Sequence, residues 1–209
     1  EKHLARTTGA TLIAGVDEAG RGPLAGPVVA AALMLDIGAD ALPRSLRARI
    51  DDSKKLDAEA REEIAGELLA LARGGAIAVG VGAASVHEID RVNILQATFL
   101  AMRRALGRLP SPPHAVLIDG NRAPAGLTMP TRAIVDGDAL CLTVAAASIV
   151  AKVVRDRAMQ RLACRYDAFG WSTNVGYGTP AHLEALAARG PSPHHRLSFA
   201  PLSQYSLNL

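Results

Sequence analysis

Gly-Val-Asp-Glu-Ala-Gly-Arg-Gly-Pro-Leu-Ala-Gly-Pro-Val, residues 15–28, joins two apolar runs that occupy residues 12–16 and 28–35. Asp17 and Glu18 follow the first run directly. Neighbouring side chains on a strand point to opposite faces, so the strand must end or bend here if both carboxylates are to face one ion. The stretch therefore predicts two strands with a pair of acids at the end of the first.

A glycine-arginine-glycine turn follows the acids. Gly20 and Gly22 permit backbone conformations and close approaches that other residues do not, and Arg21 can reach a phosphate. Carboxylates beside an arginine suit a hard divalent cation and a phosphate group. The alternative is a tight hairpin turn with solvated acids, which a lone Asp-Glu pair would favour and this long string does not. The turn lacks the G-x-G-x-x-G spacing of a dinucleotide-binding loop.

The composition of the 209-residue chain is that of a globular protein. Hydrophobic residues make up 49% of it, enough for a sizeable core, which argues against disorder. The length suits one large domain or one domain with an appendage. No apolar stretch reaches transmembrane length, and no secretory signal is visible, so we expect no membrane association.

The two cysteines, Cys141 and Cys164, fall on one predicted helix. A helix rises 1.5 Å per residue and would separate them by about 34 Å, far beyond disulfide reach. Neither cysteine has partners at zinc-binding spacing. These features predict a reducing, cytoplasmic location.

Charge is unevenly distributed along the chain. Residues 1–138 carry sixteen basic and seventeen acidic residues, whereas residues 139–209 carry seven basic and three acidic residues. This asymmetry suits a metal site in the first part and a polyanion-binding surface in the second. An ordinary solvated surface explains it about as well.

Hydrophobic periodicity and helix-capping patterns predict an α/β domain with a mixed sheet and a helical C-terminal extension. Strands are predicted over residues 11–16, 27–35, 76–82, 115–118 and 134–135, and helices over 57–73, 85–109, 142–165 and 179–190.

Acidic residues follow three of the predicted strands: Asp17 and Glu18 the first, Asp119 the fourth, and Asp136 or Asp138 the fifth. Ligands gather at strand ends in open α/β sheets. Converging carboxylates repel one another unless cations neutralise them. Two Mg²⁺ or Mn²⁺ ions would do so, and would also assist phosphodiester hydrolysis by activating water and stabilising the leaving oxygen. Taken alone, Asp119-Gly120-Asn121 and Asp136-Gly137-Asp138 each favour a plain turn, and only their joint occurrence with the first motif favours a site.

Further motifs follow in order along the chain: residues 52–56 (Asp-Ser-Lys-Lys-Leu), 118–121 (Ile-Asp-Gly-Asn), 137–138 (Gly-Asp), 145–153 (Ala-Ala-Ala-Ser-Ile-Val-Ala-Lys-Val), 155–156 (Arg-Asp), 176–179 (Gly-Tyr-Gly-Thr) and 195–199 (His-Arg-Leu-Ser-Phe). Together with residues 17–28, they closely resemble the ribonuclease HII (type 2 ribonuclease H) family over nearly the whole chain.

This resemblance implies a ribonuclease H-like α/β fold, with a mixed central sheet flanked by helices. It divides the chain into a catalytic domain, residues 1–165, and a helical substrate-binding extension, residues 166–209. It also implies an endonuclease that cleaves the RNA strand of RNA–DNA hybrids and cuts at single ribonucleotides embedded in duplex DNA. The products would carry a 3′-hydroxyl and a 5′-phosphate. We expect a monomer.

The resemblance also assigns roles to individual residues. The metal-binding and catalytic acids of the family map onto Asp17, Glu18, Asp119 and Asp138, which implies Mg²⁺ or Mn²⁺ with two ions present during catalysis. The residues that match the family's substrate contacts are Gly20, Arg21 and Gly22 for the ribose 2′-hydroxyl, Tyr177 for the sugar at the junction, and Ser53 and Lys54 for a phosphate. Contact with the 2′-hydroxyl is physically sensible because this group separates RNA from DNA.

Two positions depart from the family pattern. Asp136 and Val175 each stand where the family usually or often has Lys. Both departures remove positive charge near the expected nucleic-acid path. They bear on affinity or metal preference and leave the type of reaction unchanged.

Several other residues have both a structural and a functional interpretation. Lys152 and Asp156 are spaced as a helix ion pair, with Ser148 on the same face, and an outer role near the metals is equally open. Residues 145–147 are expected to let their helix pack closely on the sheet. For residues 194–196 a surface-charge role is favoured over phosphate contact, and for His182 a structural role.

Two classes of function are compatible with these motifs. The first is a metal-dependent ribonuclease, and the second is a module that binds hybrid duplexes without turnover. A binder has no need for four acids that repel phosphate, which favours the ribonuclease. A third possibility, a resolvase of the same fold, is disfavoured by the Gly20-Arg21-Gly22 turn and by Tyr177.

Overall fold

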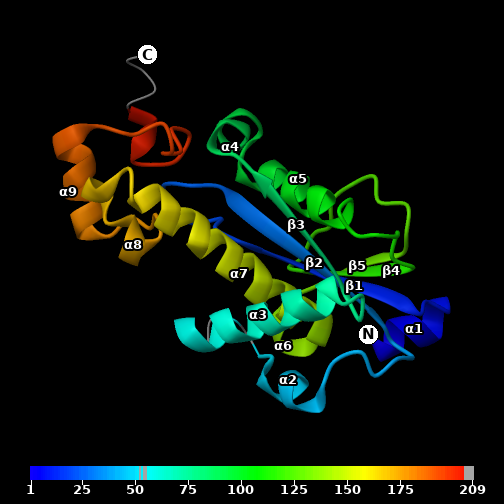
Figure 1. The fold of residues 1–209 in the computed structure, drawn as a ribbon. Helices are drawn as coiled ribbons and strands as arrows, with labels where there is room; N and C mark the ends of the chain where they lie inside the picture. The colour runs from blue at the N-terminus through cyan, green and yellow to red at the C-terminus, as the bar shows by residue number, and fades with distance from the viewer. Residues whose placement is uncertain (52, 54–55, 205–209) are drawn as a thin grey trace.

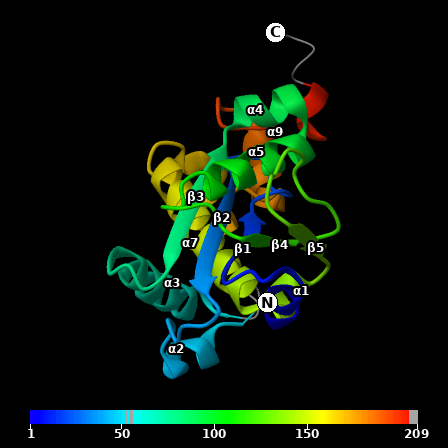
Figure 2. The ribbon, with the colours of Figure 1, turned by 90° about the vertical axis from the view of Figure 1, so that its right-hand side faces the viewer.

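The computed structural model describes residues 1–51, 53 and 56–204. Within these residues, a five-stranded mixed sheet has the order β3-β2-β1-β4-β5. Figure 2 shows this order from one edge of the sheet to the other. The strands are β1 (Leu12–Ala19), β2 (Val28–Asp36), β3 (Ala78–Ala84), β4 (Ala115–Asp119) and β5 (Thr131–Ile134). The predicted α/β fold with a mixed sheet is confirmed.

Helices surround the sheet (Figure 1). They are α1 (Lys2–Thr8), α2 (Arg44–Arg49), α3 (Ala58–Arg73), α4 (Val86–Val92), α5 (Ile94–Leu106), α6 (Gly137–Leu140), α7 (Leu142–Ala163), α8 (Trp171–Asn174) and α9 (Pro180–Arg189), with a short 3₁₀ helix at Asp167–Phe169.

β1 lies at the centre of the sheet and joins its antiparallel and parallel halves. It runs antiparallel to β2 and parallel to β4, with Val16 opposite Ile118. The carboxyl ends of neighbouring parallel strands meet at the same edge of a sheet. Asp17 and Asp119 each follow this last pair by one residue, so the register brings them to adjacent positions.

Different helices cover the two faces of the sheet (Figure 1). Alternate residues of β2 show this directly, since Ala30 belongs to the core beneath α5 and Ala31 to the core shared with α7 and α3. This is the alternation that a strand buried on both faces requires. Residues 145–147 of α7 are buried against the sheet, as predicted, because alanine lets a helix approach closely.

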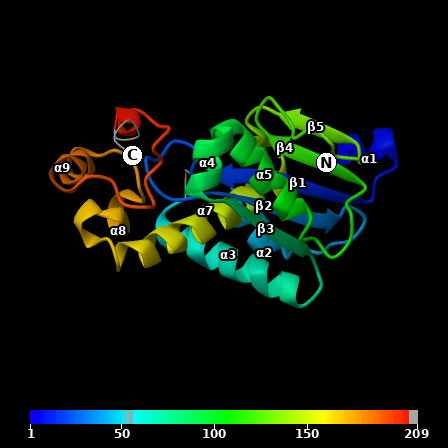
Figure 3. The ribbon, with the colours of Figure 1, turned by 90° about the horizontal axis from the view of Figure 1, so that it is seen from above.

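The C-terminal helices α8 and α9 lie at the opposite end of the molecule from α1 (Figures 1 and 3). A separate apolar cluster holds them, with Trp171 and Leu186 packed against Leu24 and Met159. The helical C-terminal extension is therefore confirmed. Its apolar cluster includes residues from the first 165, and the division into two domains at residue 165 stays a prediction.

Several local predictions were wrong. The helix expected over 85–109 is two helices, which meet at Asn93. There φ is 70°, and the side chain accepts a hydrogen bond from the Gln96 amide (3.1 Å) at the start of α5. Ser85 and Glu88 form a capping box at the start of α4. β5 begins and ends earlier than predicted, and the sequence patterns did not indicate α1 or α2. Among the described residues, no helix is both long and apolar enough to cross a bilayer.

Candidate active site

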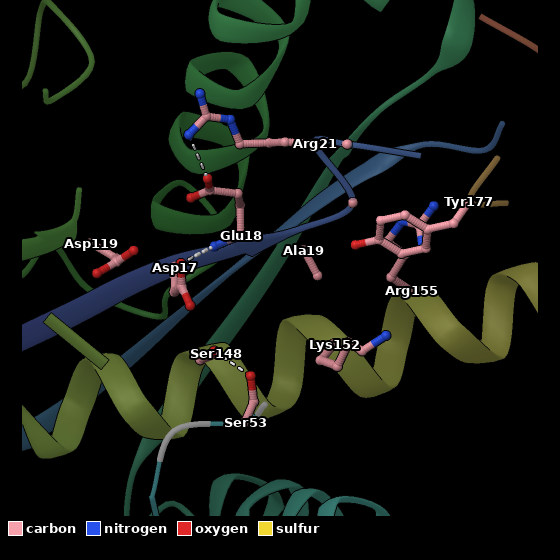
Figure 4. Close-up of a pocket in the computed structure, with 12 residues that line it drawn as sticks. Asp17, Glu18, Ala19, Arg21, Ser53, Asp119, Ser148, Lys152, Arg155 and Tyr177 are labelled. Carbon is pink, nitrogen blue, oxygen red and sulfur yellow. Dashed lines mark hydrogen bonds and ion pairs between the residues drawn. The ribbon is translucent and has the colours of Figure 1, made fainter. Parts of the chain in front are cut away.

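A cavity of about 350 Å³ opens where β1, α7 and the C-terminal region meet (Figure 4). It brings together most of the site residues predicted from the sequence. Its lining consists of Asp17, Glu18, Ala19, Gly20, Arg21, Gly22, Ser53, Asp119, Ser148, Lys152, Arg155 and Tyr177.

The two acids of β1 reach the cavity in a way that the sequence did not predict. β1 continues through both of them to Ala19, so the strand does not end between them. Figure 4 shows Asp17 projecting toward Ser148 on α7 and Glu18 projecting the other way, toward Arg21. Paired residues of β1 and β4 stop at Val16. Among the described residues, β1 has no pairing partner on that side beyond Val16, so both acids can line one cavity.

Asp17 is only 5% exposed, and this burial disfavours the charged form of its carboxyl group. The burial raises the pKa of this carboxyl group well above the usual value. The negative charges of Glu18 and Asp119 raise the pKa further, while a hydrogen bond with the Ser148 hydroxyl lowers it. One carboxylate oxygen accepts a hydrogen bond from the Glu18 amide (2.7 Å). Asp17 is therefore a carboxylate for which a nearby cation would be strongly favourable.

The environment of Glu18 also favours a bound cation. Its Oε1 accepts a hydrogen bond from Arg21 Nη1 at 3.2 Å, but its buried Oε2 has no partner among the residues that the structure describes. Burial raises the pKa of Glu18 despite the opposing charge of Arg21. A buried oxygen without a donor is costly, and coordination of a hard cation would satisfy it.

Asp119 and Asp138 are connected through the backbone. Asp119 Oδ1 accepts a hydrogen bond from the Gly137 amide at 2.8 Å. Asp138 is the next residue, in the first turn of α6, and is 8% exposed. It is not among the residues that line the cavity. Asp136 is exposed, occupies the N-cap of α6 in a left-handed conformation (φ 54°) and is not part of the cavity lining.

The acids surround the cavity without forming a closed coordination shell. Across residues 1–51, 53 and 56–204, no group of three or more His, Cys, Asp or Glu side chains has the geometry of a metal site. What the structure shows is three carboxylates on one cavity and a fourth attached to it through Gly137.

α7 supplies the polar wall opposite β1. Ser148 Oγ and Ser53 Oγ are 2.8 Å apart, which places Ser53 at the cavity. The ion pair of Lys152 with Asp156 is formed at 2.8 Å, and Lys152 also lines the cavity. Both interpretations of Lys152 are thus compatible with the geometry. Lys54 lies outside the described residues.

Arg155 packs against Gly20 of the glycine-rich turn and donates hydrogen bonds to carbonyls near it. This residue is 1% exposed, and its guanidinium donates to the carbonyls of Pro27, Val175 and Ala25 at 3.1, 3.1 and 3.2 Å. A Cβ atom on Gly20, where φ is 95°, would lie 1.9 Å from Arg155 Nε. The turn therefore needs glycine at this position. The sequence patterns contained Arg155 within a motif but did not assign it a role.

The surface role expected for residues 194–196 is wrong for two of them. His195 and Arg196 are 2% and 0% exposed. Arg196 donates hydrogen bonds to the carbonyls of Gly20, Arg21 and Gly26. Distant carbonyl groups, which no local pattern reveals, make the burial of this charge possible.

Tyr177 stands at the edge of the cavity and is 48% exposed. A Cβ atom on Gly22 would lie 3.6 Å from Tyr177 Cε1, so the ring lies beside the turn. The backbone carbonyl of Tyr177 is 2.8 Å from His182 Nδ1. The ring lies on a loop between Gly176 and Gly178, and its exposure excludes a core role.

The buried histidines form a hydrogen-bond chain whose proton positions follow from its partners. Trp171 Nε1 donates to His182 Nε2 (3.2 Å), so His182 carries its proton on Nδ1 and donates it to the Tyr177 carbonyl. His195 Nε2, 3.0 Å from His182 Nε2, must then donate, while its Nδ1 accepts from the Ser192 amide (2.9 Å). The structural role predicted for His182 fits this geometry.

We expect this histidine pair to make stability fall in acid. Burial, with the nearby charge of His182, lowers the pKa of His195 to about 4. The unfolded chain binds the proton near the usual value of about 6.5. The free energy of unfolding should therefore decrease as pH falls from about 6.5 to about 4, by roughly 3 kcal/mol for His195. Urea unfolding at several pH values measures it.

The control for this prediction is the variant His195→Gln, which should show a flatter pH dependence than the wild type. The comparison is needed because the buried carboxyls, with raised pKa values, act in the opposite direction. The same change at an exposed histidine, His3→Gln, should leave the pH dependence unaltered. Identical slopes for His195→Gln and the wild type would contradict the prediction.

The fold and the site together define a class of protein. A mixed sheet of this order, with carboxylates at the ends of neighbouring central strands and an arginine-glycine turn beside them, is the architecture of a ribonuclease H-like nuclease. The comparisons with known proteins agree. The family model for ribonuclease HII matches residues 14–202.

Individual relatives cover most of the chain. The ribonuclease HII of Granulibacter bethesdensis is 59% identical over 193 residues, which is 92% of this chain and 85% of the relative. That of Rhizorhabdus wittichii is 56% identical over 195 residues, 93% and 91% of the two chains. The crystal structure of the ribonuclease H2 from Pyrococcus horikoshii OT3 matches with a TM-score of 0.75 at 29% identity, covering 94% of this chain and 98% of that one. The chain belongs to the ribonuclease HII family and is a nuclease of the hydrolase class.

Proposed function

We propose that this protein is an endoribonuclease that hydrolyses the RNA strand of RNA–DNA hybrids and cuts at single ribonucleotides embedded in duplex DNA. The products would carry a 3′-hydroxyl and a 5′-phosphate. One observation carries the proposal: the carboxylates Asp17, Glu18 and Asp119 share a single cavity with the Gly20–Gly22 turn and Tyr177. The first group suits phosphodiester hydrolysis, and the second suits recognition of a sugar.

The donor set of the site fits divalent cations. Asp17, Glu18, Asp119 and Asp138 would hold two Mg²⁺ or Mn²⁺ ions, because carboxylate oxygens are the ligands that these ions prefer. The unpartnered Glu18 Oε2 supports this assignment. When bound, the ions supply activation of the attacking water and stabilisation of the leaving oxygen.

The remaining residues of the cavity would orient the substrate. Lys152 and Arg21 place positive charge at its rim, where they can contact phosphate oxygens. Ser53, held by Ser148, would contact another phosphate with Lys54. Backbone groups of the Gly20–Gly22 turn would contact the 2′-hydroxyl, and the ring of Tyr177 would pack on the neighbouring deoxyribose, which has no 2′-oxygen. Because these contacts come before the chemistry, they select the site of cleavage.

A binding module without turnover is a weaker interpretation. Such a module would gain nothing from three carboxylates that line one cavity and repel phosphate. The helical extension, residues 166–209, contributes Tyr177 and is proposed as the substrate-binding part. A monomeric state and a cytoplasmic location remain predictions.

The decisive experiment compares three duplexes of one sequence: DNA with a single ribonucleotide, an RNA–DNA hybrid, and DNA alone. Each is incubated with Mg²⁺, Mn²⁺ or EDTA, and the ends of the products are identified by polymerase extension and by 5′-phosphate labelling. We expect metal-dependent cleavage of the first two duplexes only. Cleavage in EDTA would overturn the metal mechanism, and cleavage of plain DNA would overturn the substrate assignment.

Tyr177→Ala is expected to depress cleavage at a single embedded ribonucleotide strongly, by about 10- to 100-fold. Its ring is half-exposed, so the melting temperature should change little, while packing on the deoxyribose is lost. Tyr177→Phe keeps the flat face and should retain most activity. If Tyr177→Ala collapses the melting temperature and leaves the junction preference unchanged, the ring has a structural role instead.

Asp138 and Asp136 should behave in opposite ways. We expect Asp138→Asn to abolish activity, because the buried carboxylate next to Gly137 is the proposed fourth ligand. We expect Asp136→Lys to preserve activity or tighten substrate binding, because this exposed acid adds negative charge near the duplex path. Steady-state kinetics on the single-ribonucleotide duplex measure both. The reverse pattern would refute the assignment.

A further inference from the structure

We propose that Arg196 is a positioning residue for reading the ribose 2′-hydroxyl: its buried guanidinium turns the carbonyls of Gly20 and Arg21 inward and thereby aims the amides of Arg21 and Gly22 at the substrate. The inference rests on the proposed function, because it assumes that the Gly20–Gly22 turn contacts the 2′-hydroxyl.

The contacts of Arg196 are concentrated on the turn and on Gly26, later in the same loop. Nη2 donates to the Gly20 carbonyl at 2.6 Å, and Nη1 donates to the Arg21 carbonyl at 2.9 Å. Nε and Nη2 both donate to the Gly26 carbonyl, at 3.0 and 2.8 Å. One planar fork with fixed donor directions therefore holds three carbonyls at once, which a lysine ammonium cannot imitate.

The directions of the Gly20 and Arg21 carbonyls also determine the directions of the next two amides. In a planar trans peptide, the carbonyl of one residue and the amide of the next point in opposite directions. The Arg21 and Gly22 amides must therefore point away from Arg196. Within the described part of the chain, neither amide has a hydrogen-bond partner, and both residues line the cavity. Two adjacent donors are thus left available to a ligand oxygen.

The guanidinium strengthens this arrangement electrostatically. Burial, with the charge of Arg155 nearby, lowers the pKa of Arg196 to about 9, so it stays protonated at neutral pH. A charged donor makes stronger hydrogen bonds than a neutral one. The turn is consequently held by charge-assisted bonds to a guanidinium that is itself buried.

The backbone of Arg196 extends the same control toward Tyr177. The Arg196 amide donates to the Leu24 carbonyl at 2.9 Å, and the Leu24 amide donates to the Gly176 carbonyl at 2.8 Å. Arg196 therefore fixes both the turn and, through Leu24, the loop next to Tyr177. The two elements proposed to read the two sugars of a junction are set relative to each other by one residue of the C-terminal region.

The test measures discrimination rather than activity alone. Binding to a DNA duplex with one ribonucleotide and to the same duplex in DNA is measured in EDTA, for the wild type and for Arg196→Lys. We expect the ratio of the two Kd values to fall about tenfold in the variant, since two hydrogen bonds to the 2′-hydroxyl are weakened, while the Kd for plain DNA stays within about twofold. Partial unfolding of the variant would instead weaken binding to both duplexes together.

Arg104→Lys is the matched control. Arg104 also donates to a backbone carbonyl, that of Ala83 at 2.7 Å, but lies on α5 and touches neither the turn nor the cavity. For Arg104→Lys, the ratio of the two Kd values should equal that of the wild type. A folded Arg196→Lys protein with the wild-type ratio would overturn the inference alone. A wild-type ratio of one would overturn the proposed function as well.

A measurement on the wild-type protein covers the case in which Arg196→Lys does not fold. Solvent exchange of the Arg21 and Gly22 amides, followed by NMR, should be fast in the free protein because these amides lack an acceptor. It should slow on addition of the ribonucleotide-containing duplex and much less with plain DNA. Equal protection by both duplexes, or slow exchange in the free protein, would overturn the inference.

Discussion

Replacing Asp17 by Asn is expected to lower kcat by about a thousandfold or more, while binding of the duplex persists. Asn keeps the size of the side chain and removes the negative charge that a divalent cation needs. It also removes a buried like charge from beside Glu18 and Asp119, so the folded state should be as stable as the wild type or more so. This loss of rate with a gain in stability separates a functional carboxylate from a structural one.

The measurement combines single-turnover cleavage of the single-ribonucleotide duplex with thermal unfolding. Asp136→Asn serves as the matched control, because it makes the same chemical change at an exposed acid outside the cavity. We expect it to retain activity. An Asp17→Asn protein that cleaves at a rate near that of the wild type would refute the proposed role of Asp17.

Gly15→Ala is expected to cost the most stability of any small substitution in β1, more than about 3 kcal/mol. A Cβ atom at Gly15 would lie 2.3 Å from the backbone carbon of Thr143 and 2.4 Å from the amide nitrogen of Val144. Backbone atoms cannot rotate out of the way as a side chain can, so α7 as a whole would have to move from the sheet. For a chain of this size, such a loss lowers the melting temperature by roughly 6–12 °C.

Activity should fall with stability in this variant, because α7 also carries Ser148 and Lys152 into the cavity. Gly66→Ala is the control. Gly66 lies within α3, and a Cβ atom there would meet nothing within 4 Å. We expect it to stabilise the protein by about 0.5–1 kcal/mol, because glycine is unfavourable inside a helix. Unfolding curves in urea measure both variants, and an unchanged midpoint for Gly15→Ala would contradict the predicted contact.

The sequence alone was sufficient for the elements whose signals are local. β1, β2 and β3 follow from apolar runs bounded by glycine and polar residues. α9 follows from the Thr179 cap with proline at its first position, which the structure reproduces. The acids at the ends of β1 and β4 could be predicted to meet, because the ends of parallel strands share one edge of a sheet.

Local sequence patterns did not predict where elements end when two structures are compatible with the same few residues. The segment 85–109 has helical periodicity throughout, but Asn93 adopts a non-helical conformation with a positive φ of 70° and uses its side chain to begin a second helix. The acids of β1 were expected at a strand end, whereas the strand continues through them. The space for both carboxylates comes from the end of pairing with β4, which is a property of the sheet.

By itself, the sequence determined the class of fold and the family, because these depend on local periodicity and on ordered motifs along the chain. It also predicted which acids form the site. Only the tertiary structure decided which charges are buried. Arg196 and Gly20 are 176 residues apart, and His195 meets His182 through a contact between C-terminal segments. A buried cation is stable only where several carbonyls converge on it, and that convergence exists only once the chain has folded.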